Sequence, residues 1–145
     1  MRSGYLGLAA FCVCFSAHAG PYGDDLAKCL VDSTTKEDRI ALVRWMFTAA
    51  AANPAVASIA KVTPKVMDEA NASTGTLFMR LLTDSCKEKA KTALKYEGPA
   101  TIQLSFQVLG QVAAGEMFAT PEVREAMSGL EKYVDKKKIE ELKNQ

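Results

Sequence analysis

Histidine is almost absent from this sequence, since His18 is the only one in 145 residues. It falls in an N-terminal segment that we expect to be removed, so the remaining chain has no imidazole for acid–base catalysis near neutral pH. Cys-His and Ser-His-Asp arrangements are excluded for the same reason. Adjacent carboxylates, such as Asp24 and Asp25, diverge by about 100° around a helix and do not face one substrate. We therefore predict that the protein is not an enzyme.

Long apolar runs are missing except at the N-terminus. Residues 5–15 are mostly apolar, Arg2 precedes them, and small residues stand at Ala17 and Ala19. This order is typical of a secretory signal peptide cleaved after Ala19. The run is shorter than the ~20 residues that cross a bilayer. We expect a signal peptide at 1–19, no integral membrane span, and a periplasmic or extracellular protein.

The mature chain has no excess charge of either sign. Arg2 is the only charged residue in 1–19, so 17 Lys and Arg remain beside 17 Asp and Glu. A neutral chain is a poor candidate for binding nucleic acid. Its length suits one domain with a buried core. We expect that helical domain at 20–135, followed by a charged C-terminal tail at 136–145.

Cysteine is reduced to a single pair once the signal peptide is removed. Cys12 and Cys14 leave with it, and Cys29 and Cys86 remain. In an oxidising compartment such a pair forms a disulfide, with two separate buried thiols as the alternative. Helical periodicity places both on apolar helix faces. The sequence therefore predicts a disulfide between two helices, with Cα atoms within about 7 Å.

Cofactor and metal motifs are also missing. Two cysteines without histidine cannot form the usual zinc sites, and there is no glycine-rich phosphate loop or haem-attachment sequence. Asp84 and Glu88 share a helix face but lack oxygen-rich neighbours. We expect no cofactor and no metal.

Helical patterns cover most of what is present, and they predict an all-α, compact bundle of five to six helices. The segment from the capping-box pattern Thr34–Glu37 to about residue 52 is apolar around most of its circumference, so we expect it to be the central, buried helix. A break or kink is expected at 71–75. The other segments with helical patterns lie at 25–32 (with Asp24 as cap), 54–61, 64–72, 76–96, 100–118 and 121–134.

Residues 101–109 are ambiguous. Their apolar and polar residues alternate as in a strand, but the apolar stripe of Ile102, Phe106 and Leu109 also fits a helix. A lone strand cannot satisfy its own hydrogen bonds, and no partner strand is evident. The helix is therefore favoured.

Isolated charges within apolar runs mark candidate interaction residues. Arg44, Arg80 and Glu116 each interrupt such a run. The simpler interpretation is that Glu116 pairs with one of these arginines, or that each charge reaches water. Alternatively, these charges and Trp45 rim a recognition surface, because Arg and Trp are favoured anchors.

Two polar rows follow predicted helices. Lys87, Lys91 and Lys95 lie at i, i+4 and i+8 on one helix face. Such a row suits either a solvated face or a site for an acidic partner. The second row, Gln103, Gln107 and Gln111, suits a homodimer or partner interface as well as a polar outer face.

These features favour a protein-binding module over catalysis. In size, export and helical class the chain resembles small helical periplasmic immunity proteins; no motif carries this resemblance, so it assigns no residues. We expect an exported binder, such as an inhibitor or immunity protein that masks another protein. The alternative is a carrier of a small apolar ligand between helices.

Overall fold

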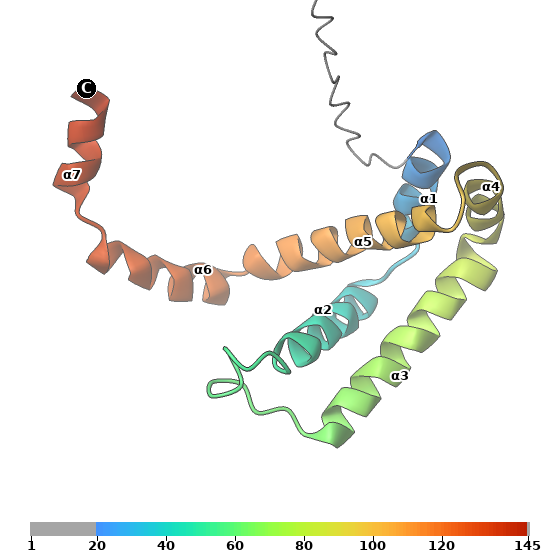
Figure 1. The fold of residues 1–145 in the computed structure, drawn as a ribbon, viewed down its shortest axis with the longest axis horizontal. Coiled ribbons are helices and arrows are strands. Elements are labelled where there is room, and N and C mark those ends of the chain that lie inside the picture. Colours follow the sequence, from blue (N-terminus) through green and yellow to red (C-terminus); the bar gives the residue numbers. More distant parts are fainter. Residues whose placement is uncertain (1–19, 145) are drawn as a thin grey trace, which may run out of the picture.

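The computed structural model describes residues 20–144, so the expected signal peptide lies outside the described residues (Figure 1). Residues 20–144 form seven α-helices and no strand, which confirms the all-α class with more helices than predicted. A π-helical turn, Leu81–Ser85, and two 3₁₀ turns, Gly129–Tyr133 and Leu142–Asn144, complete the helical structure. The helices are α1 (Pro21–Asp32), α2 (Lys36–Ala50), α3 (Pro64–Arg80), α4 (Lys87–Glu97), α5 (Ala100–Phe118), α6 (Pro121–Ser128) and α7 (Lys136–Glu141).

The core lies where α1 meets α4 and α5. Leu26 and Leu30 of α1 are fully buried together with Leu81 and Leu109. Helix α1 packs against α5 and α4, whereas α2 packs against α3 and the farther part of α5 (Figure 1). The 100–118 helix is confirmed, and its buried residues Thr101, Ser105, Leu109 and Ala113 follow a helical rather than an alternating pattern.

Helix α2 is not the central helix, contrary to the prediction. Only Leu42 and Thr48 are buried in it, while Ile40 and Phe47 are exposed. The helix lies at the side of the bundle, so its α3-facing and α5-facing flanks are covered and its outer face is not. Apolar residues around most of a helix therefore did not mean burial here.

Of the break or kink predicted at 71–75, the break is wrong, because α3 continues through these residues. Within that segment Thr74 is buried, and the Asn71 side chain accepts a hydrogen bond from Trp45, which supports the helix there. The predicted single helix at 76–96 is also wrong. The chain leaves the α-helix at Leu81, and the N–H of Cys86 donates to Leu81 O, five residues back, at 2.8 Å. Helix α4 starts afresh at Lys87.

The disulfide between Cys29 and Cys86 is confirmed, with Cα atoms 5.9 Å apart. It joins α1 to the junction between the π-helical turn and α4. Cys86 is only 2% exposed, as its apolar face predicted, whereas Cys29 is half-buried.

Helix starts differ from the sequence prediction at three places. Helix α1 begins at Pro21 and Asp24 is not its cap. The capping box of α2 joins Thr35 and Asp38, one residue later than predicted, because the Thr34 hydroxyl donates instead to Val31 O. No helix forms at 54–61, where residues 54–59 form turns instead. The Asn53 side chain accepts a hydrogen bond from the Ala55 N–H and so competes with helical bonding.

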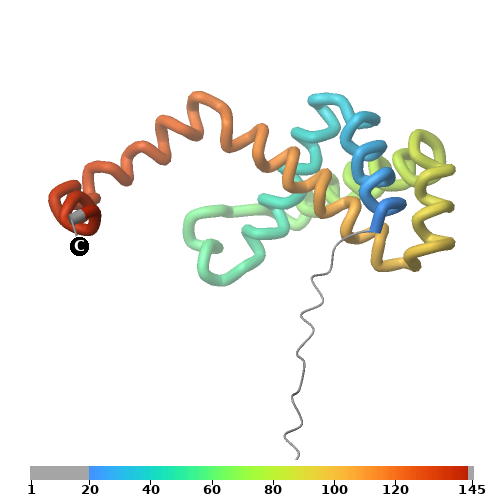
Figure 2. The backbone as a smooth tube through the Cα atoms, turned by 90° about the horizontal axis from the view of Figure 1, so that it is seen from above, coloured from blue at the N-terminus to red at the C-terminus, as the bar shows by residue number. Residues whose placement is uncertain are grey.

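The C-terminal arm, defined here as residues 121–144, leads away from the bundle in both views (Figures 1 and 2). Within the described residues α6 contacts only α5 and the following 3₁₀ turn, and α7 contacts only the turn after it. The fold is thus less compact than predicted. The expected tail is helical over Lys136–Glu141, and its residues 136–143 are exposed. Among residues 20–144 there is no helix with the length and apolar character needed to span a membrane.

Candidate functional site

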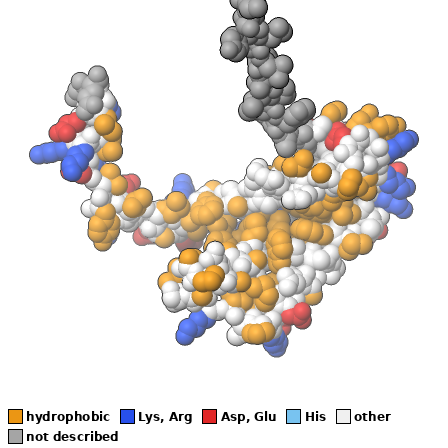
Figure 3. Space-filling view, viewed as in Figure 1, with side chains coloured by type: hydrophobic (Ala, Val, Ile, Leu, Met, Phe, Trp, Pro, Cys, Tyr) orange, Lys and Arg blue, Asp and Glu red, His pale blue; other side chains and the backbone are white. Residues whose placement is uncertain are grey.

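An open groove between α2 and α5, the α2/α5 groove, contains Arg44 and Glu116, two of the residues singled out in the sequence. It has a volume of about 240 Å³. Its walls are mainly apolar, and charged side chains stand along its rim. Figure 3 shows hydrophobic side chains gathered on the face where these helices meet. The groove is lined by Lys36, Arg39, Ile40, Val43, Arg44, Ala113, Glu116, Met117 and Thr120.

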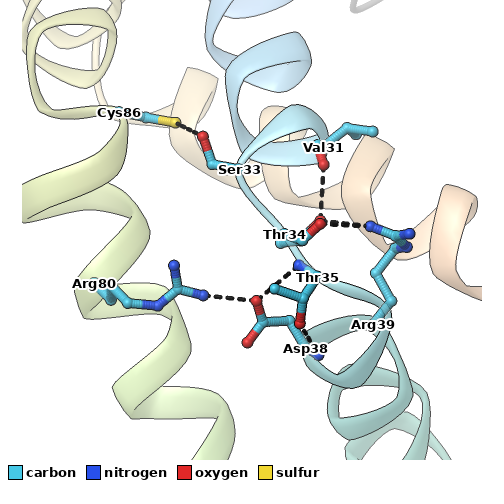
Figure 4. A network of polar contacts seen from close by, with 8 residues as sticks. All are labelled: Val31, Ser33, Thr34, Thr35, Asp38, Arg39, Arg80 and Cys86. Atoms are coloured by element: carbon cyan, nitrogen blue, oxygen red, sulfur yellow. Dashed lines mark hydrogen bonds and ion pairs between the residues drawn. The ribbon is translucent and has the colours of Figure 1, made fainter.

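Arg39 holds one end of this groove together. Its Nε donates to Glu116 Oε2 at 2.7 Å, and its Nη1 donates to Thr34 O at 2.7 Å. The guanidinium thereby ties the start of α2 to α5 and to the loop after α1 (Figure 4 shows the Thr34 side of this network). Glu116 does pair with an arginine, but with Arg39 rather than with Arg44 or Arg80.

Arg80 is engaged in a second ion pair, on the α3 side of α2. Its Nη2 donates to Asp38 Oδ2 at 2.7 Å, next to the capping box (Figure 4). Partial burial raises the pKa of Asp38, but the Thr35 N–H and the Arg80 guanidinium outweigh it and hold this pKa below its usual value. Arg80 thus fixes α3 to α2 rather than standing free on a rim.

Arg44 is more exposed than Arg39 and Arg80. It is exposed and lies on the ridge between the α2/α5 groove and a second open groove, the α2/α3 groove, of about 370 Å³. Glu37, Val66 and Glu69 line this second groove as well. Neither Arg44 nor Lys36 forms an ion pair with another described residue.

Trp45 faces the bundle rather than solvent. Its Nε1–H donates to Asn71 Oδ1 at 2.9 Å, and its ring meets the edge of Phe78 with centroids 6.2 Å apart. Phe78 stacks in turn on Phe106, at 4.1 Å between centroids. These contacts connect α2, α3 and α5. Trp45 therefore holds α2 against its neighbours and does not form the rim of a recognition surface.

The lysine row lies on a different surface. Lys87, Lys91 and Lys95 are all exposed on α4, and α2 and α4 share no contact within the described residues. Lys87 and Lys91 line an open groove over Leu94. Lys91 pairs with Glu88 at 3.1 Å, while Lys95 lies over the Tyr96 ring at 5.0 Å. The structure therefore brings Arg44 and Glu116 to the α2/α5 groove, places the lysine row on α4, and puts Arg80 and Trp45 in contacts between helices.

Of the residues that line the α2/α5 groove, sequence reasoning singled out only Arg44 and Glu116, and it missed Lys36, Arg39 and Ile40 among the others. Lys36, Ile40 and Arg44 follow one another at i and i+4, so the row was visible in the sequence. It was overlooked because α2 was expected to be buried.

No three potential metal ligands of the types His, Cys, Asp or Glu come together within residues 20–144.

Comparison with protein-family models, with curated proteins and with solved structures finds no match to this chain.

Proposed function

We propose that this chain is an exported protein-binding module that receives its partner in the α2/α5 groove. One observation carries the proposal: Ile40 is 48% exposed on an apolar groove, between two cations that have no partner among the described residues. An apolar groove rimmed by polar residues is the usual character of a protein-interaction site. A partner that fits would present apolar side chains flanked by carboxylates.

The support beneath the groove favours rigid recognition. The Arg39–Glu116 and Arg80–Asp38 pairs fix α2 on both flanks, and Trp45 packs its inner side. A surface that is already ordered loses little entropy on binding, which favours affinity. Lys36 and Arg44 add electrostatic complementarity for an acidic partner, and this contribution weakens with salt.

The finer function that we propose is inhibition or immunity, in the periplasm or outside the cell. Masking a site on another protein needs a stable scaffold and a shaped surface, and no catalytic side chain. The Cys29–Cys86 disulfide supports an oxidising location, because such bonds persist in exported proteins.

The alternative, a carrier of a small apolar ligand, has less support. The α2/α5 groove, at about 240 Å³, is smaller than most ligand pockets, which measure roughly 300–1,000 Å³ and enclose most of the ligand. The α2/α3 groove reaches about 370 Å³ but is also open to solvent and carries Glu37, Arg44 and Glu69. An apolar ligand would stay largely exposed in either groove.

A photocrosslinking experiment in the native host tests the binding surface. The photoreactive residue benzoylphenylalanine replaces Ile40 in one strain and Ile59 in a control strain. Ile59 is 83% exposed in the loop between α2 and α3, outside the groove. We expect one discrete protein adduct from position 40 and none from position 59. Equal labelling at both positions, or none at position 40 across growth conditions, contradicts the proposal.

Charge reversal then tests the chemistry of the partner. Arg44→Glu should abolish the adduct at position 40, whereas Lys87→Glu on α4 should leave it unchanged. Adduct yield should also fall as salt is raised. An adduct that is lost with Lys87→Glu and kept with Arg44→Glu would place the binding surface on α4 instead.

A further inference from the structure

The C-terminal arm carries an apolar stripe that its own chain leaves uncovered. Met127 and Leu130 are 60% and 69% exposed, and they line an open groove with Phe118 and Val134. Within the described residues the arm touches the bundle only at the end of α5. Exposed apolar side chains in a contiguous groove indicate an interface.

The stripe follows the arm through three local structures. Met127 lies on α6, Leu130 in the 3₁₀ turn that follows and Val134 at the extended residue after that turn, and all three line the same groove. The groove that they form, of about 510 Å³, runs along the arm. An elongated partner therefore fits it better than a small molecule.

The charges that flank the stripe are self-complementary. Arg124 and Glu131 both line the groove, and neither forms an ion pair with another described residue. Arg124 lies on α6 and Glu131 in the following 3₁₀ turn, so one groove carries a cation and a carboxylate seven residues apart. A second copy in antiparallel orientation brings Arg124 of one chain to Glu131 of the other, twice, about a two-fold axis.

We propose that the protein forms a homodimer in which the two C-terminal arms pack antiparallel along Phe118, Met127, Leu130 and Val134. Parallel packing would place Arg124 opposite Arg124 and Glu131 opposite Glu131, so like-charge repulsion selects the antiparallel register. The sequence suggested the glutamine row of α5 as a dimer interface. The arm is the better candidate, because it has an apolar groove and complementary charges that a homodimer contact can use. This surface is separate from the α2/α5 groove, so the proposed function does not depend on it.

Light scattering and sedimentation of the mature protein test for the dimer. Concentrations from about 1 µM to about 500 µM cover weak as well as moderate dimer affinities. We expect a concentration-dependent dimer. Met127→Glu with Leu130→Glu should give a monomer with unchanged helicity, because both side chains are exposed. The control Ile59→Glu introduces the same charge at an exposed apolar position off the arm and should remain dimeric. A monomeric wild type over the whole range overturns the proposal.

Charge exchange tests the register. Arg124→Glu and Glu131→Arg should each weaken the dimer by roughly tenfold or more, since every contact becomes a like-charge contact. Mixing the two variants should restore a dimer that contains one copy of each, and the Arg124→Glu/Glu131→Arg double variant should dimerise alone. If neither mixing nor the double variant restores assembly, the antiparallel pairing is wrong. Ile40→Glu alters the α2/α5 groove and should leave the dimer intact. This variant therefore distinguishes loss of the dimer from loss of partner binding in that groove.

Discussion

The carboxylate of Glu97, the last residue of α4, accepts a hydrogen bond at 2.9 Å from the backbone N–H of Tyr22, in the first turn of α1. Its second oxygen accepts from Gly23 N–H at 2.9 Å and from the Thr101 hydroxyl at 3.1 Å. One side chain therefore caps α1 and links it to α4 and α5. A negative charge at a helix N-terminus is stabilised by the free N–H groups and by the helix dipole.

Loss of this cap should destabilise the protein without changing its fold. We expect Glu97→Ala to lower the free energy of unfolding by about 1–2 kcal/mol. A Cβ added at Gly20 would collide with Glu97 Oε1, so Gly20→Ala should displace the same carboxylate. Urea unfolding of both single variants and the double variant measures the coupling. Full additivity would show that Gly20 and Glu97 act independently and would contradict this account.

The disulfide should contribute the largest single increment of stability that we predict. Cys29 and Cys86 are 57 residues apart in sequence, and closing a loop of that length stabilises a fold by roughly 4 kcal/mol through the unfolded state. The Cys29→Ala/Cys86→Ala variant should lose about this amount in urea unfolding. Reducing agent should shift the wild type in the same direction and leave the double variant unchanged. A reducing-agent effect on the variant would mean that the shift has another cause.

Local sequence signals predicted much of the fold because they act within one helix. The apolar periodicity of 100–118, Pro64 with Thr63 as cap, and Pro121 after Thr120 place helices correctly. The inward face of Cys86 followed from the same periodicity. The class of the fold and the disulfide were therefore predictable from the sequence.

Contacts between helices decided what the sequence could not predict. Asn71 is weak in a helix on its own, but its bond to Trp45 stabilises α3 there. The π-helical turn before Cys86 contains no glycine or proline, the residues by which a sequence usually signals a helix end. Glu97 caps α1, a helix that is distant from it in sequence. Arg39 reaches Glu116 across the bundle, so neither the pairing nor the α2/α5 groove was visible until α2 and α5 were placed.

The Asp38–Arg80 pair should make stability depend on pH in acid. Burial raises the pKa of Asp38, but the Thr35 N–H and Arg80 hold it below the ordinary value of 3.8. A carboxyl with a lowered folded-state pKa stabilises the fold above its unfolded pKa and loses that contribution as pH falls through the folded one. Arg80→Met should therefore be less stable than wild type near neutral pH, and the difference should shrink below about pH 4. Urea midpoints across this range measure it.

Lys61→Met is a matched control for that experiment, because it also removes one cation. Lys61 is exposed and forms no ion pair with another described residue. Its small effect should not change with pH. If the Arg80→Met difference persists unchanged in acid, the ion pair is not the source of the stabilisation.

Arg39 should matter more for stability than its partner Glu116. Glu116→Ala removes a half-exposed ion pair, which is typically worth less than about 1 kcal/mol. Arg39→Ala also leaves the Thr34 carbonyl without its donor, so we expect a loss of about 1–2 kcal/mol in urea unfolding. Equal effects of the two variants would show that the contact with Thr34 contributes little.

The C-terminal arm should be dispensable for the fold of the bundle. It contacts only the end of α5 within the described residues, so a chain that ends after Thr120 should unfold with a free energy within about 0.5 kcal/mol of wild type at concentrations where both are monomers. A chain that ends after Gly110 is the informative comparison. It also loses Ala113, which is buried in the core, and Glu116, the partner of Arg39. That variant should be clearly less stable, and equal unfolding free energies for the two truncations would mean that the last turns of α5 do not belong to the core.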